Sequence, residues 1–457
     1  MSNRYKDKNC LVFGTGVSGR AAAGLLIKNG ARVTLFDQNE KADKEAVRAS
    51  FDDASSLNIV LGTLSGEEKE RTDILVLSPG VPLDNPLVTE LSGRGVYVTG
   101  EIELGYELSK GELLAITGTN GKTTTTTLLG EIMKAYARGT GRNVLVVGNI
   151  GDPYTLHAPE TTEETITVAE ISSFQLETIH AFKPRVSAVL NVTPDHLNRH
   201  HSMENYAAVK KSISLNQDSG DTLVLNYDDP ITRSMAEGQK ADVVFFTGKE
   251  VPITEKRDFV HIKDGAVYVN ARRIVGISEI KLLGKHNLEN VMAAVAMAER
   301  FGVPDQVIRD TVRNFKAVEH RIEFVRNIDG VDYYNDSKGT NPDAAIKAVE
   351  AMVKPTILIG GGYDKKSTYD EFIEAFEGKV KLLILIGETA EIIKECALRH
   401  GFGAVIMADD LRDAVNIACD NAVSGDAVLL SPACASWDMF KNYEERGRLF
   451  KEYVSSL

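Results

Sequence analysis

Short apolar runs alternate with helical stretches along most of this 457-residue chain. The clearest example is residues 9–37, where the runs NCLVF and RVTLFD predict two strands joined by a glycine loop and an Ala/Leu-rich helix. A strand, a helix and a second strand in this order predict a βαβ unit. Because similar alternation continues to the end of the chain, the pattern predicts an α/β fold class with mostly parallel sheets.

The strand-like runs fall into three groups, which predict three domains. The first group adds runs at 74–77 and 96–99 and ends near Gly100. The second group comprises runs at 113–117, 144–147, 166–171, 186–192, 223–225 and 243–246, then shorter alternating pieces at 259–262 and 266–269 that suit a small antiparallel addition. The pattern restarts near Ala317, with runs at 332–335, 356–359, 382–386, 404–407 and 427–430. We therefore expect domains at 1–100, 101–317 and 318–457.

Composition and charge narrow the class of protein. The chain is 43% hydrophobic and 26% charged, as in ordinary soluble proteins. Its 52 basic and 65 acidic residues give a net charge of −13, which argues against nucleic acid or an anionic membrane as the main partner. The four cysteines form no C-x-x-C pair, and no apolar run approaches the ~20 residues that span a bilayer. We expect a cytoplasmic protein without a signal peptide.

The strongest motif is the loop Gly118-Thr119-Asn120-Gly121-Lys122-Thr123, between a predicted strand and a predicted helix. Glycines allow backbone N–H groups to surround phosphate oxygens, the helix N-terminus adds partial positive charge, and Lys122 adds a full one. Thr123 or Thr124 can offer a hydroxyl to Mg²⁺. The loop is shorter than the general pattern G-x-x-x-x-G-K-[ST], because Ile116 stands where the first glycine is expected. It predicts nucleotide binding.

A second glycine loop, Gly14-Thr15-Gly16-Val17-Ser18-Gly19, satisfies G-x-G-x-x-G, and Asp37 closes the following strand. In isolation this is the fingerprint of a dinucleotide-binding fold, so a nicotinamide-dependent dehydrogenase is one alternative. The turn Ser78-Pro79-Gly80 also follows a strand, and ligands of open α/β sheets bind at the carboxyl ends of strands.

Polar residues follow further strands in the middle of the chain. Glu170 ends an apolar run, where an acid commonly faces Mg²⁺ in phosphate-loop proteins. Asp195 and His196 follow the next run and suit the surroundings of Mg²⁺ better than a zinc site. His200 and His201 are expected on the surface. From the pattern alone, the stretch containing Lys210 and Lys211 is interpreted as a solvated helix face.

Three polar loops follow strands of the third domain. They are NDSKGTNP at 335–342, GGGYDKK at 360–366 and SPACASWD at 431–438. Each is a common kind of turn, but three such loops at one sheet edge predict a ligand site.

Together these motifs resemble the Mur ligases, ATP-dependent enzymes that build the peptide of bacterial cell-wall precursors. The resemblance covers essentially the whole chain. The resemblance rests on nine motifs, which are GTNGKTTT (118–125), GNIG (148–151), EISSFQLE (170–177), LNVTPDHL (190–197), GKHNLEN (284–290), EHRIE (319–323), YNDSKGTNP (334–342), GGGYDKK (360–366) and SPACASWDMFKNYEERG (431–447). The family's fold implies a Rossmann-like N-terminal domain, a central phosphate-loop ATPase domain and a Rossmann-like C-terminal domain.

The resemblance also implies roles for individual residues. The ATP-binding set is Gly118, Thr119, Asn120, Gly121, Lys122, Thr123, Thr124, Asn287, Arg321 and Asp336. The set for the UDP-linked substrate is Gly14, Thr15, Gly16, Val17, Ser18, Asp37, Ser78, Pro79, Gly80 and Asn149. The set for D-glutamate is Lys338, Thr340, Lys365, Ser436, Trp437 and Tyr443. The metal ligands are Thr123, Glu170, His196 and Lys210 as a carbamate, and the catalytic residues are Lys122, Glu170, His196 and Lys210.

The implied activity is ATP-dependent addition of D-glutamate to UDP-N-acetylmuramoyl-L-alanine, through an acyl phosphate and a tetrahedral intermediate. The implied cofactors are ATP and Mg²⁺, and the partners are these small molecules, with no nucleic acid and no membrane. We expect a monomer that serves peptidoglycan synthesis, and through it cell shape and division. The alternative within the family is a different amino-acid specificity, although the L-alanine-adding member is expected to carry His where this chain has Asn120.

Overall fold

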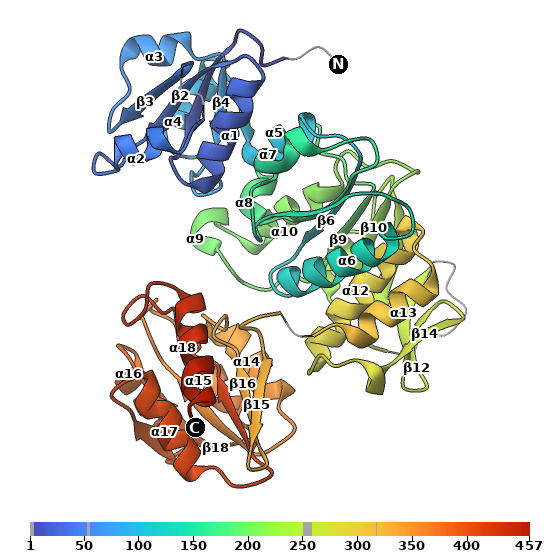
Figure 1. The fold of residues 1–457 in the computed structure, drawn as a ribbon, viewed down its shortest axis with the longest axis vertical. Helices are drawn as coiled ribbons and strands as arrows, with labels where there is room; N and C mark the ends of the chain where they lie inside the picture. Colours follow the sequence, from blue (N-terminus) through green and yellow to red (C-terminus); the bar gives the residue numbers. More distant parts are fainter. Residues whose placement is uncertain (1–3, 53–54, 250–257, 317) are drawn as a thin grey trace. The chain divides into compact units, whose positions relative to one another are not determined.

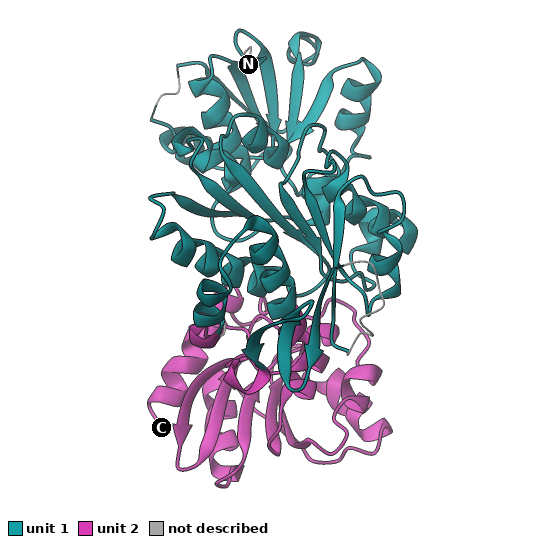
Figure 2. Ribbon diagram, turned by 90° about the vertical axis from the view of Figure 1, so that its right-hand side faces the viewer, with its two compact units in different colours: residues 1–276, 290–312 teal, residues 277–289, 313–457 magenta. Residues whose placement is uncertain are grey.

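The computed structural model describes residues 4–52, 55–249, 258–316 and 318–457 (Figure 1). Contacts divide the chain into two compact units, Met1–Gly276 with Asn290–Val312, and Ile277–Glu289 with Arg313–Leu457 (Figure 2). The first unit holds two sheets and the second unit holds one. Ala317, near which the sequence pattern restarts, lies outside the described residues. The three-domain boundaries stay a prediction.

The N-terminal sheet is parallel and has the strand order β3-β2-β1-β4-β5. Its strands are β1 (Asn9–Phe13), β2 (Arg32–Asp37), β3 (Leu57–Leu61), β4 (Ile74–Leu77) and β5 (Tyr97–Gly100). Its helices are α1 (Val17–Lys28), α2 (Lys44–Ala49), α3 (Gly66–Arg71) and α4 (Pro86–Gly93). The predicted βαβ unit at 9–37 is confirmed, because β1 and β2 pair in parallel on either side of α1. Buried apolar clusters cover both faces of the sheet.

The central sheet has the order β14-β13-β12-β11-β10-β9-β6-β8-β7. Its parallel strands are β6 (Glu112–Thr117), β7 (Val144–Gly148), β8 (Ile166–Glu170), β9 (Val186–Val189), β10 (Thr222–Asn226), β11 (Asp242–Thr247) and β12 (Phe259–Lys263). The predicted antiparallel addition is confirmed, because β13 (Ala266–Val269) pairs antiparallel with β12 and with β14 (Arg272–Gly276).

Helices join the parallel strands of this sheet, α5 precedes its first strand, and α12 and α13 follow its last strand. The helices are α5 (Glu101–Glu107), α6 (Lys122–Ala137), α7 (Tyr154–His157), α8 (Ser173–Leu176), α9 (Leu197–His200), α10 (Met203–Lys211), α11 (Pro230–Ser234), α12 (Lys285–Phe301) and α13 (Asp305–Asn314), with short 3₁₀ turns at Ala158–Glu160, Ser212–Ser214 and Ile277–Glu279. The neighbours β9, β6, β8 and β7 run in the same direction, so the loops after them gather along one edge. We call this the central sheet edge.

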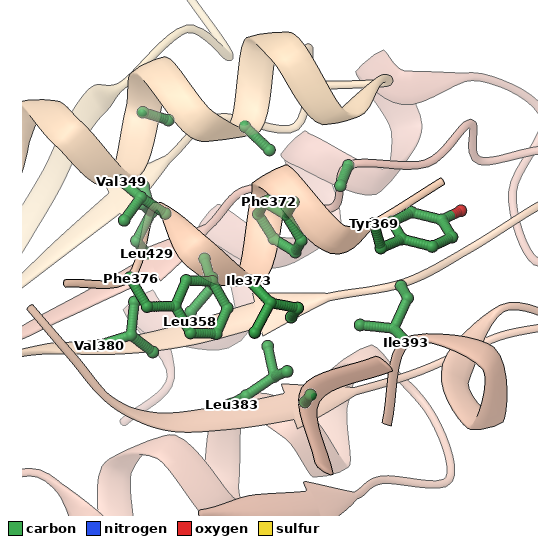
Figure 3. Close-up of a cluster of buried hydrophobic side chains, with 14 of the residues drawn as sticks. Val349, Leu358, Tyr369, Phe372, Ile373, Phe376, Val380, Leu383, Ile393 and Leu429 are labelled. Carbon is green, nitrogen blue, oxygen red and sulfur yellow. The ribbon is translucent and has the colours of Figure 1, made fainter. Parts of the chain in front are cut away.

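The second unit contains a mixed sheet in the order β15-β16-β20-β17-β18-β19. Its strands are β15 (Glu323–Ile328), β16 (Val331–Asn335), β17 (Thr356–Gly360), β18 (Val380–Leu385), β19 (Val405–Met407) and β20 (Ala427–Leu430). Its helices are α14 (Pro342–Ala351), α15 (Asp370–Glu374), α16 (Ala390–Arg399), α17 (Leu411–Asn421) and α18 (Tyr443–Ser455). One face of the sheet packs through Leu358, Leu383 and Leu429 against Phe372 and Phe376 (Figure 3).

The three polar loops predicted at one edge of this sheet do share an edge. β16, β20 and β17 are adjacent and parallel, so residues 335–342, 431–438 and 360–366 follow neighbouring strand ends. The sequence patterns missed β3, β14 and β15. β15 is an edge strand with mostly exposed or half-buried positions, so it lacks the apolar run that marks the inner strands.

Among the described residues, no helix combines the length and apolar composition that a bilayer crossing requires.

Candidate active site

The loop after β6 has the backbone of a phosphate-binding loop. Gly118 and Gly121 have φ of +153° and +86°, values that L side chains rarely adopt, and Gly121 caps α6. A Cβ on Gly121 would lie 2.1 Å from Asn290 Oδ1, so the site needs glycine for space as well. The Lys122 ammonium donates to the carbonyls of Gly118 and Thr119, both at 2.9 Å. The lysine therefore lies over the loop, where a phosphate would be held.

The chain after β9 fixes this loop from the neighbouring strand. The Asn191 side chain accepts from Asn120 N at 2.8 Å and donates to Asn120 O at 3.0 Å. Thr119 Oγ1 accepts from Thr193 N at 3.0 Å. These bonds hold the phosphate loop in one shape before any nucleotide arrives, which lowers the entropy cost of binding.

Glu170 ends β8 beside the loop, and it is buried. Its Oε1 accepts from Asn149 Nδ2 at 2.7 Å, whereas its Oε2 is buried without a hydrogen-bond partner among the described residues. An unpartnered buried carboxylate oxygen is costly unless a cation or a water satisfies it. The buried Thr124 hydroxyl in the same edge is also unpartnered within the described chain. These oxygen donors fit a hard cation such as Mg²⁺.

Lys210 reaches the central sheet edge from α10. The interpretation of this stretch as a solvated face is wrong for Lys210, which is only 1% exposed. Its Nζ donates to Gly118 O at 2.9 Å and lies 4.5 Å from the centre of the Tyr206 ring. Burial, and then the positive charge of Lys122, lowers the pKa of Lys210 well below its ordinary value. No carboxylate of the described residues forms an ion pair with it.

The histidines after β9 separate into two groups. His196 has a left-handed backbone (φ +52°) and presents a half-exposed ring beside Asp195, at 3.4 Å. The expectation that His200 lies on the surface is wrong, because the turn of α9 brings it inside. His200 Nε2 bonds to Ser173 Oγ at 3.0 Å, and burial lowers its pKa. His201 is exposed, as expected.

Arg199 is a site residue that the sequence patterns did not single out. Its guanidinium donates to Pro79 O at 2.8 Å and to Val81 O at 3.1 Å, and forms a two-point ion pair with Glu177. It also stacks on Phe174, at 4.1 Å. Phe174 in turn contacts the His196 ring, with centroids 4.8 Å apart. Arg199 thus connects the turn after β4 to the central sheet edge.

If residues 78–80 hold the UDP-linked substrate, as the resemblance implies, we expect Arg199→Lys to raise the KM for that substrate about tenfold, because a loss of about 1.4 kcal/mol in binding free energy corresponds to a tenfold change. A lysine ammonium cannot make the two-point carboxylate bond and both carbonyl bonds at once. The KM for ATP should change little. Steady-state kinetics against each substrate measure this difference. Arg233→Lys is the matched control, since Arg233 also stacks on an aromatic ring and donates to a carbonyl but does not contact residues 78–81.

The first glycine loop, after β1, is shaped by close packing. A Cβ on Gly19 would lie 1.8 Å from Gly14 O, and one on Gly14 (φ +111°) would lie 2.6 Å from Ser78 Oγ. Thr15 donates to Asp37 through its N–H and its hydroxyl, at 2.9 and 2.8 Å. Ser78 Oγ is buried and has no partner in the part of the chain that the structure describes. The predicted set 14–18, 37 and 78–80 therefore meets at one edge of this sheet. Val17 is exposed there.

In the second unit, Asp336 and Arg321 lie together at the end of β16. Asp336 is buried, and its carboxylate accepts from Ser431 Oγ at 2.7 Å and Ile322 N at 3.2 Å. Burial raises the pKa of Asp336 to about 6, although the charge of Arg321 opposes this. Arg321 Nε is buried and unpartnered among the described atoms. Asn287 donates to Leu283 O at 2.7 Å within the same unit.

The polar loops of this unit are joined by Arg446, which the sequence patterns also missed. Its guanidinium is 1% exposed and donates to Ser337 Oγ at 3.0 Å, to Ser337 O at 2.9 Å and to Cys434 O at 3.2 Å. Burial lowers its pKa to about 10. Arg446 comes from α18, so it joins the nearby loop after β20 to the loop after β16, which is distant in the sequence.

The residues expected around an amino acid lie on these loops, except Tyr443, which begins α18. Lys338 Nζ lies 5.5 Å from the Tyr443 ring, and Lys365 Nζ lies 5.2 Å from the Trp437 ring. Trp437 is 63% exposed, whereas Ser436 is buried and Thr340 is half-buried. The loops thus combine two ammonium groups with an open aromatic surface, which suits a small ligand carrying carboxylates.

A phosphate loop on a parallel sheet, with a buried acid at the end of the neighbouring strand β8 and a buried lysine reaching the loop from α10, defines a nucleotide-phosphate-binding α/β protein. Comparison with known proteins narrows this class. Residues 8–100 match the Mur ligase MurD-like N-terminal domain, residues 116–298 the Mur ligase middle domain, and residues 320–434 the Mur ligase glutamate ligase domain. The chain belongs to the Mur ligase family.

Named relatives agree with this assignment. The chain is 52% identical to the UDP-N-acetylmuramoylalanine–D-glutamate ligase of Lachnospira eligens and 49% identical to that of Lachnoclostridium phytofermentans, over 99% of each chain in both cases. The UDP-N-acetylmuramate–alanine ligase of Thermotoga maritima is 18% identical, with a TM-score of 0.60 over 98% of this chain and 99% of that one. A pseudomurein peptide ligase of Methanothermus fervidus has a TM-score of 0.58 at 18% identity, covering 98% and 100%. These structures share the fold.

Proposed function

We propose that this chain is an ATP-dependent amide ligase that adds D-glutamate to UDP-N-acetylmuramoyl-L-alanine in peptidoglycan precursor synthesis. The identity of about half of all residues to named D-glutamate ligases, over nearly the full length of both chains, carries this proposal. The family assignment removes the nicotinamide-dependent dehydrogenase as an explanation of the first glycine loop. A different amino-acid specificity within the family is the remaining competitor.

The central sheet edge supports activation of a carboxylate by ATP. A carboxylate is a poor acyl donor, so one oxygen of the alanyl carboxylate first bonds to the γ-phosphorus as ADP leaves. The D-glutamate nitrogen then bonds to the carbonyl carbon, and the tetrahedral intermediate expels phosphate and loses a proton to give the amide. Lys122 supplies fixed positive charge where negative charge gathers during phosphoryl transfer.

Glu170, His196, Thr123 and Lys210 are the proposed Mg²⁺ ligands, with Lys210 as a carbamate. The unpartnered Oε2 of Glu170 fits such a cation. When bound, Mg²⁺ neutralises phosphate charge during transfer. The Asn149 bond to Glu170 fixes the carboxylate orientation, and it would join a residue proposed for the UDP-linked substrate to a proposed metal ligand.

Carbamylation of Lys210 explains an otherwise costly burial. A buried ammonium without a carboxylate partner is destabilising. Addition of its neutral amine to CO₂ forms a nitrogen–carbon bond, releases one proton and leaves a carboxylate on the lysine. That anion sits near the positive charge of Lys122 and can bind a metal.

The remaining assignments follow from the family. We propose that residues 14–18, 37, 78–80 and Asn149 hold the UDP-linked substrate, that Asn287, Arg321 and Asp336 contact ATP, and that Lys338, Thr340, Lys365, Ser436, Trp437 and Tyr443 surround D-glutamate. The ammonium groups of Lys338 and Lys365 match the two carboxylates of glutamate in number and opposite charge. We propose a cytoplasmic monomer whose partners are these small molecules.

An amino-acid panel tests the specificity. With ATP, Mg²⁺ and UDP-N-acetylmuramoyl-L-alanine present, phosphate release should require D-glutamate, and L-alanine, L-glutamate or a diamino acid should not replace it. Omitting the UDP-linked substrate is the control, and it should abolish release. Equal turnover with L-alanine or a diamino acid would contradict D-glutamate as the substrate. The assignment of the chain as an ATP-dependent ligase would still stand.

A further inference from the structure

Three side chains that could ligate a metal, and a fourth carboxylate beside them, lie together at α15 and α16, apart from the polar loops described above. Asp370 and Glu374 lie four residues apart at the two ends of α15, and Cys396 and His400 lie four apart at the end of α16. Residues at this spacing lie on one face of a helix. Asp370, Cys396 and His400 each offer one ligand atom, and these three atoms lie within 4.8 Å of one another.

The imidazole of His400 lies between two carboxylates. Its Nε2 is 2.9 Å from Asp370 Oδ1, and its Nδ1 is 3.7 Å from Glu374 Oε1. In metal sites a histidine commonly ligates through one nitrogen while a carboxylate orients the other, and Glu374 is placed for that second role. Cys396 is only 2% exposed, so its sulfur forms the inner wall of the cluster.

The hydrophobic core fixes the two backbones that carry these ligands. Tyr369, Phe372, Ile373 and Phe376 pack from α15 and its flanks, and Ile393 packs from α16, in one buried cluster (Figure 3). Because the apolar sides of both helices are buried, the polar side chains between them are held close without a metal. A preformed set of ligands needs little rearrangement to bind a cation.

We propose that Asp370, Cys396 and His400 bind a thiophilic divalent cation of the zinc class, with Glu374 orienting His400. A sulfur, a nitrogen and an oxygen ligand suit Zn²⁺ or Co²⁺ and disfavour Mg²⁺, which prefers oxygen ligands. Three protein ligands leave a fourth tetrahedral position for water. The Cys396 thiol releases its proton to solvent as the sulfur ligates. The cation would tie α15 to α16, independently of the proposed ligase chemistry.

Arg399 competes with the cation for one oxygen. Its Nη2 donates to Asp370 Oδ1 at 3.2 Å, but its side chain is 64% exposed and can turn into solvent. Metal binding therefore has to displace this exposed ion pair, which contributes little stability by itself. Removing Arg399 should strengthen metal binding, whereas removing a ligand should abolish it.

Titration of the full-length protein with Co²⁺, in reducing buffer with excess Mg²⁺, tests the site. We expect one equivalent to bind with the near-ultraviolet absorption of a cobalt–thiolate bond and the visible bands of tetrahedral cobalt. Cys396→Ser and His400→Gln should lose both signals. Glu374→Gln should weaken affinity about 10- to 100-fold. Arg399→Gln should tighten binding.

Cys419→Ser is the matched control, because Cys419 is a free cysteine of the same unit outside this cluster and its variant should keep both signals. Thermal unfolding without metal checks that each variant is folded. Absence of thiolate absorption in the wild-type protein would overturn the proposal. So would absorption that persists in folded Cys396→Ser, which would assign the cobalt to another cysteine.

Discussion

Replacing Lys210 with alanine is expected to lower ligase turnover by about 100-fold or more, a loss typical of removing a preorganised charged group from an active site. Lys210 is buried, donates to the carbonyl of Gly118 in the phosphate loop, and in the proposed carbamate form supplies a metal ligand. Short carboxylates such as formate or acetate fit the space that the shortened side chain leaves. They should restore part of the activity by supplying the missing anion.

The neighbouring lysine gives the control for this experiment. Lys211→Ala removes an ammonium from the same helix, where it donates to Glu237 O, and should change turnover little. Phosphate release with both substrates present, measured with and without added carboxylate, separates the two variants. Full activity of Lys210→Ala would contradict a role for Lys210. Failure of every short carboxylate to rescue a folded, inactive variant would contradict the carbamate.

Replacing Lys122 with alanine is expected to reduce turnover about 100- to 1,000-fold, because it removes the full positive charge that faces the transferred phosphoryl group. Binding of UDP-N-acetylmuramoyl-L-alanine should persist, since the residues proposed to hold it lie at the ends of other strands, β1, β2, β4 and β7. Calorimetric titration of that substrate and of an ATP analogue measures the two effects separately.

Lys134→Ala is the matched control for Lys122, because Lys134 lies on the same helix α6 and pairs with Glu131 at the surface. It should keep wild-type kinetics. Undiminished phosphate release by Lys122→Ala would show that the loop after β6 is not the phosphoryl-transfer site.

The positions of most strands along the chain and the phosphate loop could be predicted from the sequence because both depend on local patterns. Buried parallel strands appear as apolar runs, and the glycines at 118 and 121 are required where φ is positive. The edge strand β15 was missed because its exposed positions break the apolar pattern.

Residues that act through distant contacts could not be found in this way. Arg199 reaches residues 79 and 81, and Arg446 reaches Ser337, each more than a hundred positions away in the chain. The burial of Lys210 likewise depends on its reach to Gly118, on another element. A charged residue in a predicted helix fits the same sequence pattern whether its side chain faces solvent or a functional site. Only the tertiary structure distinguishes these two environments.

The central claim is that this chain uses ATP to convert the substrate carboxylate into an acyl phosphate before D-glutamate attacks. The most direct test labels both oxygens of the alanyl carboxylate of UDP-N-acetylmuramoyl-L-alanine with heavy oxygen. Mass spectrometry then follows the label through a complete reaction. We predict that each phosphate released carries one labelled oxygen and that each amide product retains one. Unlabelled phosphate, with amide formed, would contradict carboxylate activation by ATP.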